Sequence, residues 1–221
     1  IGINHNNDIN IAKKMIDVAK SSGADAIKFQ TFRTEDLMAK DRTGKSRFNM
    51  LKQLELSQKK FKSLKDYCRD KRIIFLSTPF DSNSAHFLYR LGVPAFKIAS
   101  GELTNTLLLL QIADYHMPII LSTGMATLNE VKEAVKTIYS TGNKALILLH
   151  CTSNYPARFE DVNLRAMETL RQRFSTPVGY SDHTEGIEVS VAAVAKGASI
   201  IEKHFTIDRK LKGPDHSFAL E

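Results

Sequence analysis

The chain has 221 residues, of which 43% are hydrophobic and 25% are charged. This composition is typical of a globular protein with one large core, and it excludes a disordered, collagen-like or coiled-coil chain. The longest apolar runs, such as Ala145–Leu149, are far shorter than the ~20 residues of a membrane-spanning helix. Cys68 and Cys151 are the two cysteines and form no C-x-x-C motif. We therefore expect a protein of a reducing, cytoplasmic environment, without a membrane segment.

The 31 Lys and Arg residues outnumber the 24 Asp and Glu residues, which gives a net charge of +7. Most basic residues lie scattered in amphipathic stretches, and no aromatic residues interleave with a basic cluster. This pattern predicts a solvated surface and no nucleic-acid partner. Lys28 and Lys97 are exceptions, because each lies inside an apolar run.

Short apolar runs alternate with segments of helical period. The predicted strands are Ile1–Ile3, Ala24–Phe29, Ile73–Leu76, Ala95–Ile98, Pro118–Leu121, Ala145–Leu149, Thr176–Tyr180 and Ala198–Ile201. Helical spacing occurs in three of the intervening segments, at Ile9, Ala12, Met15, Ile16 and Ala19, at Val131, Ala134, Val135 and Ile138, and at Ile187, Val191, Val194 and Ala195. Helix caps are predicted at Asp8, Ser57, Gly23, Gly92, Gly142 and Gly197.

Eight strand and helix units predict an α/β protein with a (β/α)8 TIM barrel over residues 1–221, clipped in its first strand. A doubly wound open sheet is the alternative, but the expected G-x-G-x-x-G is absent after the first run. Because the chain opens at Ile1 inside an apolar run, we expect that residues precede it in the whole protein. The polar, basic segment Arg33–Glu55 is a predicted lid over the site.

Active sites of such barrels form at the carboxyl ends of the strands, and every predicted strand here is followed by polar or ionisable residues. Lys28 and Lys97 are flanked by residues of the opposite strand face, so both ammonium groups are expected in the interior. An anion such as a phosphate or carboxylate would compensate them, beside Thr78, Ser100 and Ser181. Two alternatives stay open: lysines that extend outward to water, and a lysine that forms a Schiff base.

His183 and His204 follow the last two predicted strands, with Glu202 on the same face as His204. Neighbouring strands lie about 4.8 Å apart, so the two imidazoles can meet on one divalent cation that polarises a carbonyl. A single histidine would more commonly be a satisfied core residue. Among the others, His5 is ambiguous, His150 supports the site, and the surface positions are His86 and His116. Cys151 is read as a small buried thiol, and Asp215 as a turn carboxylate that either is solvated or lies over the site.

The motifs after the strands resemble the N-acetylneuraminate (sialic acid) synthase family over essentially the whole chain. They are Ile1-Gly2-Ile3-Asn4-His5-Asn6, Lys28-Phe29-Gln30-Thr31-Phe32, Ser77-Thr78-Pro79-Phe80-Asp81, Lys97-Ile98-Ala99-Ser100-Gly101-Glu102, Leu121-Ser122-Thr123-Gly124-Met125-Ala126, Leu149-His150-Cys151-Thr152-Ser153, Gly179-Tyr180-Ser181-Asp182-His183-Thr184, Glu202-Lys203-His204-Phe205-Thr206 and Gly213-Pro214-Asp215-His216. The resemblance implies a barrel that condenses phosphoenolpyruvate with an N-acetylated hexosamine and water to a nonulosonic acid and phosphate.

The resemblance also implies roles for individual residues. His183 and His204 would hold a divalent metal, Mn²⁺ first, with Mg²⁺ or Co²⁺ as alternatives. The phosphoenolpyruvate would be bound by Lys28, Thr78, Lys97, Ser100 and Ser181. Glu202, Asp215 and Lys97 would act in catalysis, and Tyr155 and Asn154 would line the sugar pocket.

The chain departs from the family pattern in ways that bear on activity. A catalytic glutamate stands before the family's first Ile-Gly, and this chain begins at Ile1. The resemblance implies a C-terminal antifreeze-like domain that reaches into the partner of a homodimer, and we expect it to be absent from this chain, which ends at Glu221. Because Ser153 and Asn154 stand at variable positions, the sugar stays open between N-acetylmannosamine and diacetamido sugars. Rival functions are a Schiff-base pyruvate aldolase using Lys97 or Lys28, a synthase for a phosphorylated sugar, and a non-catalytic binding barrel.

Overall fold

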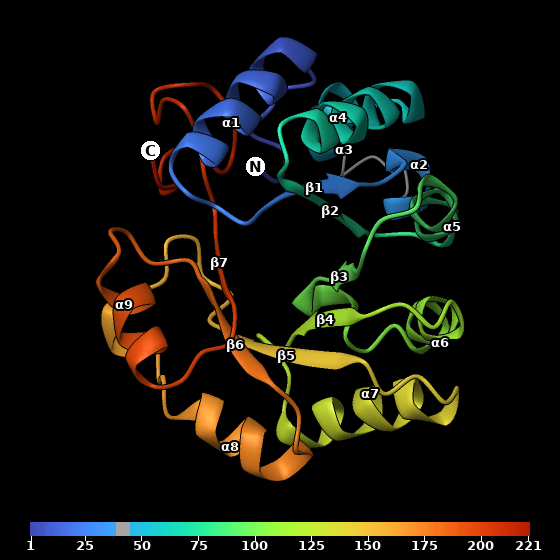
Figure 1. Cartoon of the computed structure of the whole chain (residues 1–221), viewed down its shortest axis with the longest axis vertical. Helices are drawn as coiled ribbons and strands as arrows, with labels where there is room; N and C mark the ends of the chain where they lie inside the picture. Colours follow the sequence, from blue (N-terminus) through green and yellow to red (C-terminus); the bar gives the residue numbers. More distant parts are fainter. Residues whose placement is uncertain (39–44) are drawn as a thin grey trace.

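The computed structural model describes residues 1–38 and 45–221. Parallel strands line the inside of the molecule and helices cover the outside (Figure 1). The α-helices are α1 (Ile9–Ser21), α2 (Thr34–Leu37), α3 (Lys45–Leu54), α4 (Gln58–Asp70), α5 (Ser82–Leu91), α6 (Thr106–Asp114), α7 (Leu128–Ser140), α8 (Ala166–Phe174) and α9 (Glu188–Ala195). Short 3-10 turns cover η1 (Ser100–Glu102) and η2 (Phe159–Asp161).

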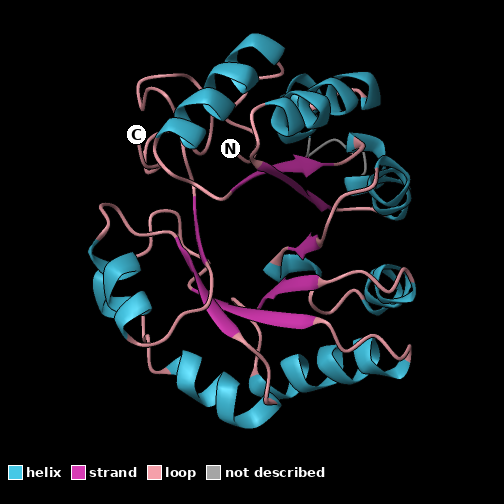
Figure 2. Ribbon diagram, in the orientation of Figure 1, coloured by secondary structure: helices cyan, strands magenta, loops and turns pink. Residues whose placement is uncertain are grey.

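The strands are β1 (Ala26–Thr31), β2 (Ile74–Pro79), β3 (Phe96–Ile98), β4 (Ile119–Ser122), β5 (Leu146–Cys151), β6 (Val178–Asp182) and β7 (Ile201–Lys203). They form a parallel pair, β1-β2, and a parallel five-stranded sheet in the order β3-β4-β5-β6-β7. Figure 2 shows that these strands curve around a common interior. Parallel strands joined by helices bring their carboxyl ends to one side of the molecule.

Seven of the eight predicted strands are confirmed, although β7 begins at the end of its predicted run. Ile1–Ile3 does not form a regular strand and makes one parallel bridge, from Gly2 to Phe29. The reason is that Gly2 has a left-handed φ of 56°, and the Asn4 amide then donates to the Ile1 carbonyl in a turn.

The predicted caps are confirmed. Asp8 accepts from the amides of Asn10 and Ile11, and Ser57 accepts from Lys60. Gly92 is the left-handed cap of α5, and the other three predicted glycines also have positive φ just past their helices. These local signals place the helix ends because the first and last turns lack internal hydrogen-bond partners.

The helical spacing in residues 187–195 predicts α9 correctly, but it does not identify which side of the helix is buried. Val191 and Val194 are 62% and 57% exposed, whereas Val189 and Ala193 are the buried positions. The helix is apolar around much of its circumference, so spacing alone did not single out the side that packs on β6.

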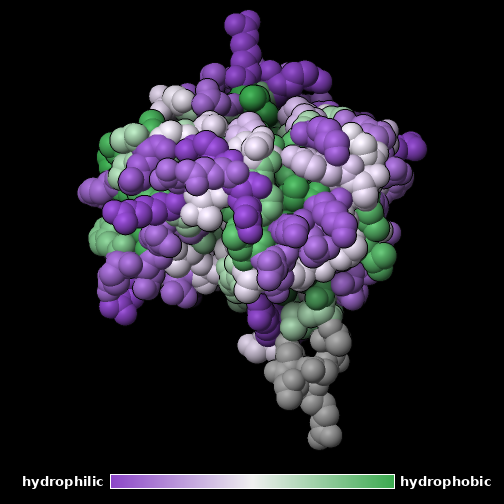
Figure 3. All heavy atoms as spheres, turned by 90° about the horizontal axis from the view of Figure 1, so that it is seen from below, coloured by the Kyte–Doolittle hydropathy of each residue, from purple (hydrophilic) through white to green (hydrophobic). Residues whose placement is uncertain are grey.

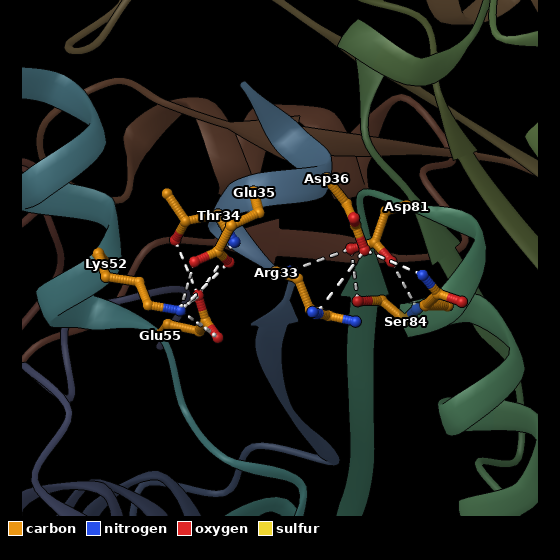
Figure 4. A network of polar contacts seen from close by, with 9 residues as sticks. Arg33, Thr34, Glu35, Asp36, Lys52, Glu55, Asp81 and Ser84 are labelled. Atoms are coloured by element: carbon orange, nitrogen blue, oxygen red, sulfur yellow. Dashed lines mark hydrogen bonds and ion pairs between the residues drawn. The ribbon is translucent and has the colours of Figure 1, made fainter. Parts of the chain in front are cut away.

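The predicted lid contains α2 and α3, and part of it, residues 39–44, lies outside the described residues. Its two ends are tied together, because Glu55 accepts hydrogen bonds from the Thr34 amide and hydroxyl, and Lys52 pairs with Glu35 and Glu55 (Figure 4). Beneath it, Ile3, Phe32 and Leu54 form a small apolar cluster separate from the main core. These contacts hold α2 and α3 beside the carboxyl end of β1.

On the side of the molecule seen in Figure 3, hydrophilic residues cover most of the surface and hydrophobic ones show in separate areas. This agrees with the predicted solvated distribution of charge. Among the described residues, no helix combines the length and apolar character needed to cross a membrane.

Candidate active site

The candidate site lies at the carboxyl ends of the strands, where residues from β1, β3, β6 and β7 meet. A cavity of about 410 Å³ opens between β1 and β7. Lys28, Lys97, Glu202 and His204 line one part of it, and it extends to residues 22–24 just before β1. Lys28 and Lys97 both reach this interior, as predicted from their places in apolar strands. The alternative that both extend outward is wrong, since the Lys97 side chain is 4% exposed.

Two lysines converge on one carboxylate. Lys97 Nζ lies 3.8 Å from Glu202 Oε1, and Lys28 Nζ lies 3.8 Å from Glu202 Oε2. Lys28 also donates to the Thr78 hydroxyl at 3.4 Å. Two cations therefore face one anion, which leaves an excess positive charge suited to a second anionic group.

Burial and charge shift the pKa values in this group. Burial of Glu202 alone would raise its pKa, but the nearby Lys28 and Lys97 ammonium groups and the Ser181 hydroxyl together lower it to about 2. Glu202 is therefore a carboxylate at neutral pH. Burial lowers the pKa of Lys97, and the charge of Lys28 adds to this effect.

Ser181 links β6 to the charged group. It is the register partner of Glu202, and its hydroxyl donates to Glu202 Oε1 at 2.9 Å. Ser181 Oγ also lies 3.4 Å from His183 Nε2. Side chains two residues apart on a strand share a face, so Ser181 and His183 lie on the same side of β6. Ser181 therefore connects Glu202 and its two lysines to a predicted metal ligand.

The imidazoles of His183 and His204 lie side by side, with ring centroids 5.7 Å apart. His183 Nδ1 donates to the Thr152 carbonyl at 2.6 Å, which leaves the Nε2 lone pair for a metal. His204 Nδ1 is buried and has no hydrogen-bond partner among the described residues. Burial lowers the pKa of His183, and burial with the charge of Lys28 lowers that of His204 to about 3. Both rings are therefore neutral, as metal ligands must be.

Asp215 completes this corner of the site. Its Oδ2 lies 3.5 Å from His204 Nδ1, and burial raises its pKa. Within residues 1–38 and 45–221, no group of three or more His, Cys, Asp or Glu side chains is arranged to hold a metal ion. The donors that suit a divalent metal here are the two neighbouring imidazoles of His183 and His204, and two nitrogen ligands leave the other metal positions open to substrate and water.

The remaining predicted site residues are less tightly grouped. The Tyr155 ring packs on His183 at 4.2 Å between centroids and also contacts His204 and Phe218. Ser100 lies 3.4 Å from the Ser153 hydroxyl. Asn154 is exposed beside Tyr155, so its side chain is free to face a ligand or solvent.

Two functional contacts were missed by sequence reasoning. Lys97 donates to the Ser122 hydroxyl at 2.8 Å, and the Thr152 carbonyl orients His183. Ser122 follows a predicted strand, so its polarity at the rim was a usable signal. The Thr152 contact uses a backbone atom and left no signal in the residue type.

The expectations for His86, His116 and Cys151 are confirmed. His86 and His116 are exposed, and the Cys151 thiol is buried, which raises its pKa. His150 lies 2.8 Å from the Val162 carbonyl through Nε2, a structural contact. The ambiguous His5 is fully buried, and its Nδ1 accepts a hydrogen bond from the Asn7 amide at 2.9 Å.

These features define an α/β protein whose strand ends bring a pair of lysines together beside a pair of histidines. The NeuB family model matches residues 15–221. The chain is 47% identical to N,N'-diacetyllegionaminic acid synthase of Campylobacter jejuni over 233 aligned positions, covering 100% of this chain and 70% of that protein. It is 38% identical to N-acetylneuraminate-9-phosphate synthase of Homo sapiens over 232 positions, covering 100% of this chain and 64% of that protein. The chain thus spans about two thirds of the length of these relatives.

A solved structure agrees with the sequence relatives. The N-acetylneuraminic acid (sialic acid) synthetase of Leptospira borgpetersenii, crystallised with citrate, superposes with a TM-score of 0.95 at 42% identity, covering 100% of this chain and 76% of that chain. The chain belongs to the NeuB family.

Proposed function

We propose that this chain is the catalytic unit of a nonulosonic acid synthase, which condenses phosphoenolpyruvate with an N-acetylated hexosamine and water. The observation that carries the proposal is the convergence of Lys28 and Lys97 on Glu202, next to the His183 and His204 pair. This group offers a cationic pocket for phosphate and carboxylate beside two neutral imidazoles. Family membership supports the same reaction class.

The proposed reaction joins C3 of the enolpyruvate to the aldehyde carbon of the sugar. Water adds its oxygen to C2, and phosphate leaves with the bridging oxygen as the C2–O bond breaks. Lys28 and Lys97 orient the phosphoenolpyruvate and neutralise its charge throughout these steps. Lys28 and Lys97 keep Glu202 as a carboxylate, and the Ser181 hydroxyl donates a hydrogen bond to it. Asp215, whose pKa is raised by burial, is the group suited to carry a proton next to the sugar.

His183 and His204 would hold a divalent metal, with Mn²⁺ as the first expectation. When bound, the metal supplies Lewis-acid polarisation of the sugar aldehyde. The Tyr155 ring beside both imidazoles would form one wall of the sugar pocket. Asn154, exposed beside it, is proposed to set the choice of sugar among N-acetylmannosamine and the diacetamido sugars.

We also propose that the strands close into an eight-membered (β/α)8 barrel, with Ile1–Ile3 in the remaining place between β7 and β1. The Gly2 amide donates to the Lys28 carbonyl on β1, and a Cβ on Gly2 would lie 3.7 Å from His204 Cε1, just after β7. The segment therefore touches both neighbours that the closing strand must have. A cytoplasmic location and a homodimer of the whole protein remain predictions.

The test is phosphate release by the purified protein with phosphoenolpyruvate, Mn²⁺ and a panel of N-acetylated hexosamines, including 6-phosphorylated ones. We expect release that depends on one of these sugars and stops on chelation. Preference for a phosphorylated sugar would move the substrate to the rival synthase class. If the full-length protein releases no phosphate with any of these sugars, the proposal is wrong and the chain is a non-catalytic binding barrel.

One observation favours a second candidate, a Schiff-base pyruvate aldolase. Burial lowers the pKa of Lys97, which would favour the neutral amine that such chemistry needs. Against it, the Glu202 carboxylate 3.8 Å away favours the charged ammonium form of Lys97, which is not a nucleophile. Borohydride reduction in the presence of pyruvate separates the two, because a covalent adduct on Lys97 or Lys28 would establish the aldolase.

A further inference from the structure

A buried ion pair stands directly before both predicted metal ligands. Asp182 and Lys203 are the last residues of β6 and β7 and are register partners. His183 and His204 follow them immediately in the chain. The Asp182 side chain is fully buried and that of Lys203 is 10% exposed.

The pair lies on the side of the strands opposite to the site. Successive strand residues point to opposite faces, so Ser181 and Glu202 meet in the interior while Asp182 and Lys203 meet on the outer face, near α9. Ser190 of α9 donates to Asp182 Oδ2 at 2.6 Å. The paired side chains therefore lie on the face opposite to Ser181 and Glu202, although Lys203 also contributes to the wall of the cavity between β1 and β7.

Lys203 contacts the residues on both sides of His183, one of the two predicted metal ligands. Its ammonium group donates to Asp182 Oδ2 at 3.0 Å and to the Thr184 carbonyl at 2.6 Å, so it holds the residues on both sides of His183. Thr184 is tied in turn to Asp182 Oδ1, through its amide at 2.9 Å and its hydroxyl at 2.7 Å. Lys203, which stands next to His204 in the chain, thus fixes the backbone around His183.

Beyond this pair the two strands turn to different partners. The His183 carbonyl accepts from the Ala157 amide, and the His204 carbonyl accepts from the Leu220 amide. The ion pair therefore makes its cross-strand link at the last rung before the two backbones separate.

We propose that Asp182 and Lys203 are positioning residues that set the spacing of the His183 and His204 imidazoles for a divalent cation. This inference rests on the metal site of the proposed function. Removing one partner leaves a buried charge without compensation and frees the end of the β6 and β7 ladder. Contacts that orient metal ligands from behind are worth about 10–100-fold in metal affinity.

The test is titration of the metal-free protein with Mn²⁺, in which the electron paramagnetic resonance signals of free and bound Mn²⁺ are measured. We expect Lys203→Met to raise the Mn²⁺ Kd by about 10–100-fold and to broaden the bound signal. Lys203→Arg keeps the positive charge and can donate to both Asp182 and the Thr184 carbonyl, so it should retain most of the affinity. Lys71→Met is the matched control, because Lys71 makes a surface pair with Asp17 at 2.7 Å, and its Kd should equal that of the wild type.

Circular dichroism and the thermal midpoint separate positioning from loss of fold. If Lys203→Met does not fold, Ser190→Ala replaces it, since this change removes one hydrogen bond to Asp182 and keeps both charges. A folded Lys203→Met or Ser190→Ala protein with wild-type Kd and signal would overturn the inference. If the wild type binds no Mn²⁺, or if His183→Ala does not abolish the binding, the metal site of the proposed function is wrong instead.

Discussion

Lys97 Nζ on β3 and Glu202 Oε1 on β7 face each other at 3.8 Å across the interior of the molecule. The residues are far apart in sequence, and their pairing is what turns two separate strand ends into one site. Because Lys28 approaches the other carboxylate oxygen at the same distance, two positive charges face one negative charge, which suits the phosphoenolpyruvate of the proposed function.

Replacing the buried lysine should weaken phosphoenolpyruvate binding. We expect Lys97→Met to raise the KM for phosphoenolpyruvate by about 10–100-fold, since a hydrogen bond to a charged group is worth roughly 1.5–3 kcal/mol. Initial rates at varied phosphoenolpyruvate would measure it, with Lys136→Met, an exposed lysine of α7, as control. An unchanged KM in Lys97→Met would remove Lys97 from the anion site.

Removing one imidazole should abolish metal-dependent turnover. His183→Ala is expected to lower kcat/KM at least about 100-fold at fixed Mn²⁺, because a metal with a single protein ligand is lost. Phosphate release measures the effect, and His86→Ala on the exposed side of α5 should match the wild type. A His183→Ala rate equal to that of the wild type would refute its assignment as ligand.

Close packing between β6 and β7 predicts a large difference between two glycine substitutions. A Cβ on Gly179 would overlap the Ile200 carbonyl oxygen and lie 2.7 Å from Leu149 Cδ2, whereas a Cβ on Gly101 has open space. We expect Gly179→Ala to lower the free energy of unfolding by about 1–3 kcal/mol or more. Gly101→Ala should change it by less than about 0.5 kcal/mol. Urea denaturation of both variants decides, and equal midpoints would contradict the close approach of the strands.

The buried Cys68 predicts a loss of stability at high pH. Burial raises the pKa of this thiol from 9.0 to about 12. Above the unfolded-state value the unfolded chain releases the proton while the folded protein keeps it, so stability falls as pH rises toward the folded-state pKa. The stability of the wild type relative to Cys68→Ala should therefore be constant up to about pH 8 and shrink toward about pH 11. A constant difference over the whole range would show that Cys68 titrates alike in both states.

Much of the fold could be predicted from the sequence because strand and helix signals are local. Seven apolar runs became strands, and Asp8, Ser57 and Gly92 marked helix ends. The exception, Ile1–Ile3, bends at Gly2 after one bridge. Val191 and Val194 are exposed although they follow the helical spacing, because the buried side of α9 depends on the elements that pack against the helix.

For the site, the sequence by itself determined which residue types stand at the strand ends: two lysines in apolar runs, two histidines and a glutamate. Only the tertiary structure decided their partners. Glu202 lies between both lysines, Thr152 orients His183, and Lys203 bridges Asp182 and Thr184. The physical reason is that strand period and residue type are properties of neighbouring residues. Register, burial and backbone contacts arise only when segments distant in sequence pack together.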